Sequence, residues 1–218
     1  MIRTLRRNAI AALIAALCAN AAWAQTAESA SAPAASSELS AELFYQLLLG
    51  ELNAIGGEPG VGFSLMLDAA RKTDDPRLYK RATDIALRGR SGESALQAAR
   101  AWRTAQPQSR EANRYLLQIL IGLNRVPEAL DPLRRELTFS SSHERIGAIN
   151  GVPGFFARTG DKQAAAQLVE QALAEYLNDP TLGPAAWTSI GRLRLDAKDL
   201  EAAHAAACLL YTSPSPRD

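Results

Sequence analysis

The chain has 218 residues, a formal net charge of +1 and 47% hydrophobic residues, which excludes a broadly disordered chain because enough apolar material is present for a packed core. Aromatic residues make up only 6% of the sequence and alanine is abundant, a balance that favours closely packed helices over a β-sandwich.

The first 24 residues have the layout of a secretory signal peptide. Three arginines stand within the first seven positions, and an apolar run follows over residues 9–17. The run is too short to span a membrane comfortably, and Ala22-Trp23-Ala24 forms a small-x-small site before Gln25. We therefore expect cleavage between Ala24 and Gln25, no transmembrane span after cleavage, and export to the periplasm or cell envelope. A plain hydrophobic N-terminal helix is the alternative, and the charged start argues against it.

The two cysteines lie outside the expected mature body. Lipidation of Cys18 is a further alternative for the N-terminus, but bulky Leu17 stands where a small residue is usual. With Cys208 in the last eleven residues, residues 25–207 contain no thiol, so we expect no disulfide, cysteine nucleophile or thiolate metal site there. Residues 25–207 also carry two more acidic than basic side chains. A nucleic-acid partner is therefore not expected, because it would call for a clear basic excess.

Residues 25–38 consist mainly of Ala, Ser and Pro, and we expect a disordered linker there. From residue 39 onward, apolar residues recur three and four positions apart, the spacing of one helix face. Helix breakers recur at short intervals, and no run of strands is recognisable. The pattern predicts an all-α fold made of ordinary helices of three to four turns.

A repeat underlies these helices. Five stretches align as a turn followed by a helix start: GEPGVG (57–62), RSGESA (90–95), NRVPEA (124–129), GDKQAA (160–165) and KDLEAA (198–203). Each ends in a small residue that would let two helices approach closely, and the intervals between these ends are 33, 34, 36 and 38 residues. A period near 34 with a helix–turn–helix in each unit predicts a helical solenoid.

The units resemble tetratricopeptide repeats. In residues 187–207, Trp187, Ile190-Gly191 and Ala203 match the Trp, the Leu-Gly pair and the Ala of the motif, whereas Arg194 stands where an aromatic residue is usual. Leu49-Gly50 matches in the first unit. Two departures are Pro153, expected to interrupt the first helix of the fourth unit, and Gly62, which replaces Ala in the first. The resemblance implies a right-handed α–α superhelix of about five units over residues 39–207. The alternative is an irregular helical bundle.

The last eleven residues, CLLYTSPSPRD, break the repeat inside a helix. They resemble one reading frame of a transposase adapter used in sequencing libraries, so we expect residues 208–218 to be a non-native tail on a truncated repeat domain. A natural disordered tail is the alternative. Truncation predicts that residues 184–207 fray and exchange amide hydrogens fastest, and that residues 110–137 exchange slowest.

No pattern for chemistry stands out. The two histidines, His143 and His204, have no ligand partner at metal-binding spacing, so no metal site is expected. The Gly-rich stretch over 57–62 lacks the Lys-Ser/Thr of a phosphate loop, and Asp residues cluster before Pro, as turn formers do. We expect no cofactor and no catalytic residue.

What remains is a binding surface. The resemblance implies that the first helices of the units line a concave face that takes a partner's peptide or helix. Its register places six residues in that groove, which would be mildly basic and suited to an acidic segment or a C-terminal carboxylate: Lys80, Arg114, Gln118, Asn150, Thr188 and Arg192.

An exported protein-interaction scaffold is therefore the leading hypothesis, and ordinary solvated helix faces are the plain alternative for the six residues. Two other functions remain open. One is the helical part of a truncated periplasmic enzyme, such as a peptidoglycan-cleaving one, and the other is an outer-membrane assembly factor anchored through Cys18.

Overall fold

A computed structural model describes residues 39–212 of the chain. The chain divides into two units, residues 1–40 and 41–218, and every described helix belongs to the second. The expected signal peptide, the whole of the expected linker and the last six residues lie outside the described range. No strand occurs in residues 39–212, so the predicted all-α fold class is confirmed. No helix in this range is both long and apolar enough to cross a membrane.

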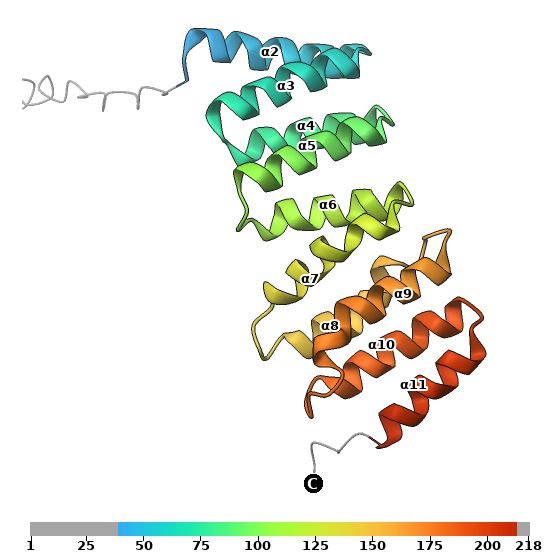
Figure 1. The fold of residues 1–218 in the computed structure, drawn as a ribbon. Coiled ribbons are helices and arrows are strands. Elements are labelled where there is room, and N and C mark those ends of the chain that lie inside the picture. Colours follow the sequence, from blue (N-terminus) through green and yellow to red (C-terminus); the bar gives the residue numbers. More distant parts are fainter. Residues whose placement is uncertain (1–38, 213–218) are drawn as a thin grey trace, which may run out of the picture. The chain divides into compact units, whose positions relative to one another are not determined.

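The helices follow one another as helix–turn–helix units (Figure 1). The first unit contains α2 (Ala41–Gly56) and α3 (Pro59–Thr73), and the second contains α4 (Pro76–Arg88) and α5 (Gly92–Ala105). Within each of these units the two helices pack against each other, and α3 also packs against α4. Consecutive units are therefore stacked.

The third unit begins with α6 (Arg110–Gly122). Its second helix starts as a 3-10 turn, η1 (Val126–Ala129), which contains Pro127, and continues as α7 (Leu130–Thr138). α6 packs against α5 on one side and against α7 and η1 on the other.

The fourth unit contains α8 (Arg145–Phe155) and α9 (Lys162–Leu173), which runs into η2 (Ala174–Tyr176). The fifth contains α10 (Gly183–Asp196) and α11 (Leu200–Thr212). α10 packs on both α8 and α9. The described range thus contains the five units predicted from the repeat, and α11 continues through the first residues of the expected tail.

Four of the turns inside the units share one backbone motif. Gly57, Arg90, Asn124 and Lys198 have positive φ angles of 99°, 54°, 57° and 61°. In each case the amide of the next residue donates to the carbonyl five residues earlier, which is the Schellman arrangement that ends a helix. The connection between α8 and α9 lacks it. The aligned turns of the sequence therefore correspond to a repeated three-dimensional feature.

The small residue after each turn permits close helix packing, as expected. A Cβ atom on Gly62 would lie 2.7 Å from the carbonyl oxygen of Gly50 and 2.8 Å from the amide nitrogen of Ala54. The equivalent Ala95 and Ala129 are fully buried. In the last unit, Ala203 is only half-buried.

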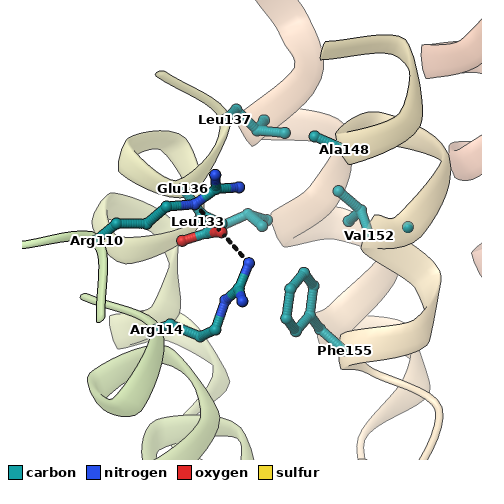
Figure 2. A pocket seen from close by; sticks show the side chains of 9 residues that line it. Arg110, Arg114, Leu133, Glu136, Leu137, Ala148, Val152 and Phe155 are labelled. Atoms are coloured by element: carbon teal, nitrogen blue, oxygen red, sulfur yellow. Dashed lines mark hydrogen bonds and ion pairs between the residues drawn. The ribbon is translucent and has the colours of Figure 1, made fainter. Parts of the chain in front are cut away.

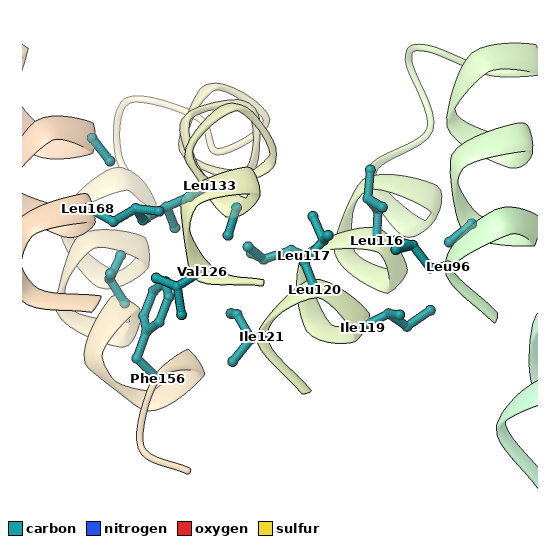
Figure 3. Close-up of a cluster of buried hydrophobic side chains, with 14 of the residues drawn as sticks. Leu96, Leu116, Leu117, Ile119, Leu120, Ile121, Val126, Leu133, Phe156 and Leu168 are labelled. Carbon is teal, nitrogen blue, oxygen red and sulfur yellow. The ribbon is translucent and has the colours of Figure 1, made fainter. Parts of the chain in front are cut away.

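The centre of the core surrounds α6, whose second half, residues 115–122, is apolar except for Gln118. In Figure 3, Leu116 and Ile119 lie on the side of α6 that faces Leu96 of α5, whereas Leu117 and Ile121 lie on the side that faces Val126. All of these side chains are buried. The helix is therefore covered on two sides, as its composition predicts.

The expectation that Pro153 interrupts the first helix of the fourth unit is wrong. α8 continues through Pro153 and ends at Phe155. Proline has no amide hydrogen, so the carbonyl of Ile149 loses its intrahelical donor. The buried hydroxyl of Ser189 in α10 donates to that carbonyl at 2.8 Å. A neighbouring helix thus replaces the hydrogen bond that proline removes.

Candidate functional site

The first helices of neighbouring units are joined by polar contacts. Glu51 of α2 forms an ion pair with Arg81 of α4, and the Nζ atom of Lys80 in α4 lies 2.6 Å from a carboxylate oxygen of Glu111 in α6. α8 and α10 also pack against each other. One partner segment could therefore contact side chains of both α4 and α6. The same holds for α8 and α10.

The structure describes all six residues predicted to bind a partner, and each lies on a first helix, in α4, α6, α8 or α10. Lys80 and Thr188 are half-buried. The other four are exposed: Arg114, Gln118, Asn150 and Arg192.

The charge of Lys80 is engaged within the protein. Its hydrogen bond to Glu111 raises the pKa of Lys80, and the ammonium lies 5.9 Å from the ring centroid of Tyr115. The Tyr115 hydroxyl donates to a carboxylate oxygen of Asp84 at 3.2 Å, and partial burial raises the pKa of Tyr115. A partner carboxylate would therefore have to compete with Glu111 for Lys80.

The other two predicted cations differ from each other. Arg114 forms an ion pair with Glu136 at 2.8 Å. Arg192 and Thr188 line a cavity of about 270 Å³ between α10 and α11 together with Trp187. Gln118 and Asn150 do not line this cavity, and they do not line a second cavity, beside Arg114, between α6, α7 and α8. The predicted basic character is therefore reduced, because two of the three cations already have internal partners.

A second cavity, of about 210 Å³, lies where α6, α7 and α8 meet (Figure 2). Arg110 and Arg114 of α6 both donate to the same oxygen, Oε1, of Glu136, at 3.0 and 2.8 Å. Arg110 also donates to the hydroxyl of Ser140 at 3.3 Å. Figure 2 shows the two arginines on one side of Glu136, and the apolar residues of α8 on the other side. The apolar lining comes from α7 and α8: Leu133, Leu137, Ala148, Val152 and Phe155.

The repeat register points to Arg114 but not to Arg110 or Glu136. A signal was present, since Leu133 and Leu137 mark the buried face of α7 and Glu136 lies three residues after Leu133 on that same face. An acidic residue on an apolar face indicates a paired or functional carboxylate. Its partners lie in another helix and could not be read from spacing.

The described residues show no cluster typical of metal chemistry: in 39–212, no group of three or more His, Cys, Asp or Glu side chains is placed to hold a metal ion. The acidic residues of the turns have structural roles. Asp75 accepts a hydrogen bond from the amide of Arg77 and begins α4, and Asp179 accepts from the amides of Thr181 and Leu182.

No protein-family model and no curated protein matches the sequence. Among solved structures, the chain is similar to MamA from Desulfovibrio magneticus RS-1, with 10% identity, a TM-score of 0.44, and coverage of 79% of this chain and 95% of that chain. It is also similar to TTC0263, a thermophilic TPR protein of Thermus thermophilus, with 18% identity, a TM-score of 0.37, and coverage of 81% and 94%. PilW, a type IV pilus biogenesis factor, shows 17% identity, a TM-score of 0.39, and coverage of 80% and 78%.

The geometry of this chain itself defines its architecture. Five consecutive helix–turn–helix units, a turn motif repeated in four of them, and packing between successive units are all present in residues 41–212. The described part of the chain is a tetratricopeptide-like helical solenoid.

Proposed function

We propose that the chain is an exported scaffold that binds a peptide segment of a partner protein along the first helices α4, α6, α8 and α10. The observation that carries the proposal is the placement of accessible polar side chains on each of these four helices, next to neighbours that are buried in the core. A rigid row of helices can present such side chains without rearrangement, which lowers the cost of ordering the partner.

The partner segment is expected to be acidic. Arg114 and Arg192 are exposed, and a carboxylate on the partner can hydrogen-bond to a guanidinium through two donors at once. Thr188 and Gln118 would add uncharged contacts. The internal partners of Lys80 and Arg114 make this selectivity modest, because an incoming carboxylate replaces an existing ion pair.

The test is a selection of displayed peptides on the full chain, followed by fluorescence polarisation with the enriched peptides. A variant with Lys80→Gln, Arg114→Gln and Arg192→Gln should weaken binding about 10-fold or more. The matched control replaces two exposed arginines of second helices, Arg71→Gln and Arg134→Gln, and should leave binding unchanged. The groove proposal fails if both variants bind the peptides as the unmodified chain does.

Export is tested separately, by intact mass measurement of the protein recovered from the periplasm of a bacterial host. A mature N-terminus at Gln25 supports the signal peptide. A mass that retains residues 1–24 contradicts it, and a lipid-modified Cys18 would favour the membrane-anchored alternative.

A further inference from the structure

We propose that two copies of this chain associate through the face of α2 that points away from α3, as an antiparallel pair of helices related by a two-fold axis. α2 is not one of the four helices assigned to the partner groove. The inference therefore goes beyond the proposed function and can be tested separately from it.

α2 carries two apolar stripes, and only one of them is used within the described fold. The inner stripe packs on α3 and is buried or half-buried: Leu43, Leu47, Gly50 and Ala54. A Cβ atom on Gly50 would lie 3.0 Å from the Cε atom of Met66 in α3, which shows how close this contact is. The outer stripe lies on the opposite side of the helix, and all of its members are exposed: Ala41, Tyr45, Leu48, Leu52 and Ile55.

The spacing of the outer stripe is that of a helix that packs against another helix. Its members stand four, three, four and three residues apart, which is the alternation of the a and d positions in a heptad. α2 has 16 residues and is about 24 Å long, so the stripe runs along nearly the whole helix. Single exposed apolar residues need no partner, but a continuous apolar stripe marks an interaction surface.

The position of α2 leaves this stripe uncovered in a single copy. Figure 1 shows α2 at one end of the stacked units, with α3 as its neighbour. The end of a solenoid usually has a polar outer face, yet Tyr45 is 62% and Ile55 is 79% exposed. The only charged residues of α2 are Glu42 and Glu51, and Glu51 already pairs with Arg81. Residues 25–38, mainly Ala, Ser and Pro, contain no apolar stripe that could pair with it.

A second copy fits because the outer stripe is complementary to itself. When Leu48 of each copy packs beside Leu52 of the other in antiparallel order, Tyr45 of each copy comes beside Ile55 of the other, since both pairs share one centre along the helix. Antiparallel order also keeps the two Glu42 carboxylates apart and opposes the two helix dipoles. A parallel pair would bring like charges and like helix ends together.

The exposed apolar area is enough for a weak dimer. The four large side chains of the outer stripe and the adjacent Phe44 expose roughly 500 Å² per copy. A pair would then remove about 1,000 Å² from water, which is near the lower limit for a specific interface. Aromatic residues such as Phe44 and Tyr45 are enriched in such interfaces. We therefore expect a dissociation constant between about 1 and 100 μM.

Sedimentation velocity of the full chain, recovered from a bacterial host, tests the association. The chain should be a monomer near 1 μM and a dimer near 200 μM, with no larger species, because a two-fold interface closes on itself. A monomer over this whole range overturns the proposal. Species that grow beyond a dimer also overturn it, because they indicate head-to-tail contact.

A matched pair of variants locates the interface. Leu52 in α2 and Leu195 in α10 are both 58% exposed, so a glutamate at either position should leave the helical circular dichroism signal unchanged. Leu52→Glu should weaken dimerisation about 100-fold, because each interface would contain two buried carboxylates. Leu195→Glu should leave dimerisation unchanged. An unchanged dimer in Leu52→Glu, or an equal loss in Leu195→Glu, contradicts the assignment to α2.

Disulfide cross-linking tests the antiparallel order, in a Cys208→Ser background that removes the exposed thiol of the described residues. A mixture of a Tyr45→Cys chain with an Ile55→Cys chain should give a linked dimer. Either chain alone should stay unlinked, because equivalent residues would lie about 15 Å apart along the helices and a disulfide requires Cα atoms within about 7 Å. Linkage of Ile55→Cys with itself would indicate parallel helices and overturn the proposed arrangement.

Hydrogen exchange at two protein concentrations gives a test without variants. Near 1 μM, α2 should exchange rapidly, as expected for an uncovered end helix. Near 200 μM, exchange in α2 should become slower, whereas exchange in α11 should not change. Equal exchange in α2 at both concentrations would contradict the proposal.

Discussion

Gly62 and Gly147 both lie inside helices, yet a methyl group would meet opposite surroundings at the two positions. At Gly62 it would collide with the backbone of α2, including the carbonyl of Gly50 at 2.7 Å, whereas at Gly147 no atom lies within 4 Å. A backbone atom cannot move aside as a flexible side chain can. The same substitution is therefore expected to change stability in opposite directions.

Gly62→Ala should lower the free energy of unfolding by about 1–3 kcal/mol, because the hairpin of α2 and α3 must open to admit the methyl group. Gly147→Ala should raise it by about 0.5–1 kcal/mol, because alanine loses less backbone entropy in a helix than glycine. Urea unfolding followed by circular dichroism measures both changes. A stabilising Gly62→Ala would mean that α2 and α3 are further apart than described.

The sequence predicted a small residue at this position but not which one. The period placed Gly62, Ala95 and Ala129 in equivalent positions, so Gly62 counted as a departure from the motif. The reason for glycine lies in Gly50 and Ala54 of the partner helix, at distances that spacing along the chain does not contain. Residue type at a close approach therefore depends on atoms that only the folded structure brings together.

At the scale of helices, α8 and α10 share a hydrogen bond that proline makes necessary. Ser189→Ala should lower the free energy of unfolding by about 1–3 kcal/mol, since it leaves the buried carbonyl of Ile149 without a donor. In a Pro153→Ala background, the amide of residue 153 can donate to that carbonyl within α8. The cost of Ser189→Ala should then be smaller, and a double-mutant cycle of urea unfolding measures the difference. Additive losses would show that Ser189 acts through packing alone.

The ion pair between α2 and α4 makes stability depend on pH. Hydrogen bonds from Arg81 lower the pKa of Glu51, and burial opposes this shift only in part. Because the folded pKa lies below the ordinary value of about 4.3, the stabilisation is complete above that value and disappears as the pH falls through the lower, folded pKa. The pair is partly exposed, so its contribution should be below about 1 kcal/mol.

Glu51→Gln tests this dependence. At pH 7 the variant should unfold at a slightly lower urea concentration than the unmodified chain. Near pH 3, below the ordinary glutamate value, the difference should shrink, because folding must then remove a proton from Glu51 before the ion pair can form. Glu58→Gln is the control: Glu58 is an exposed glutamate next to α3 and forms none of the described salt bridges. A difference between Glu51→Gln and the unmodified chain that stays constant with pH would contradict the role of the charge.

Helices and turns were largely predictable, whereas the junctions between units were not. Apolar periodicity and the aligned turns predicted the five units, because both signals are local. The passage of α8 through Pro153 depended on Ser189, which lies in the next unit. Likewise, the resemblance placed Arg114 on an accessible helix face, but its pairing with Glu136, and the cavity beside it, arise from contact between three helices.

At the scale of the whole repeat domain, burial is concentrated in the middle units. Among the described residues, α2 buries only Gly50 and α11 only Ala206, and α2 leaves large apolar side chains such as Phe44, Tyr45 and Ile55 exposed. α6, by contrast, is covered on two sides. In a solenoid each unit is stabilised by its neighbours, so units with one neighbour open most easily.

Hydrogen exchange should therefore be slowest in α6 and fastest in α2 and α11. The sequence alone assigned the fastest exchange to all of residues 184–207, but α10 buries Ala186, Ser189 and Ile190 against the fourth unit. Fast exchange is thus expected from Leu200 onward and not in α10. Mass spectrometry of peptides from the exchanged full chain separates these segments. Uniform protection over residues 41–212 would contradict stacked units that open from their ends, because every helix would then unfold only with the whole domain.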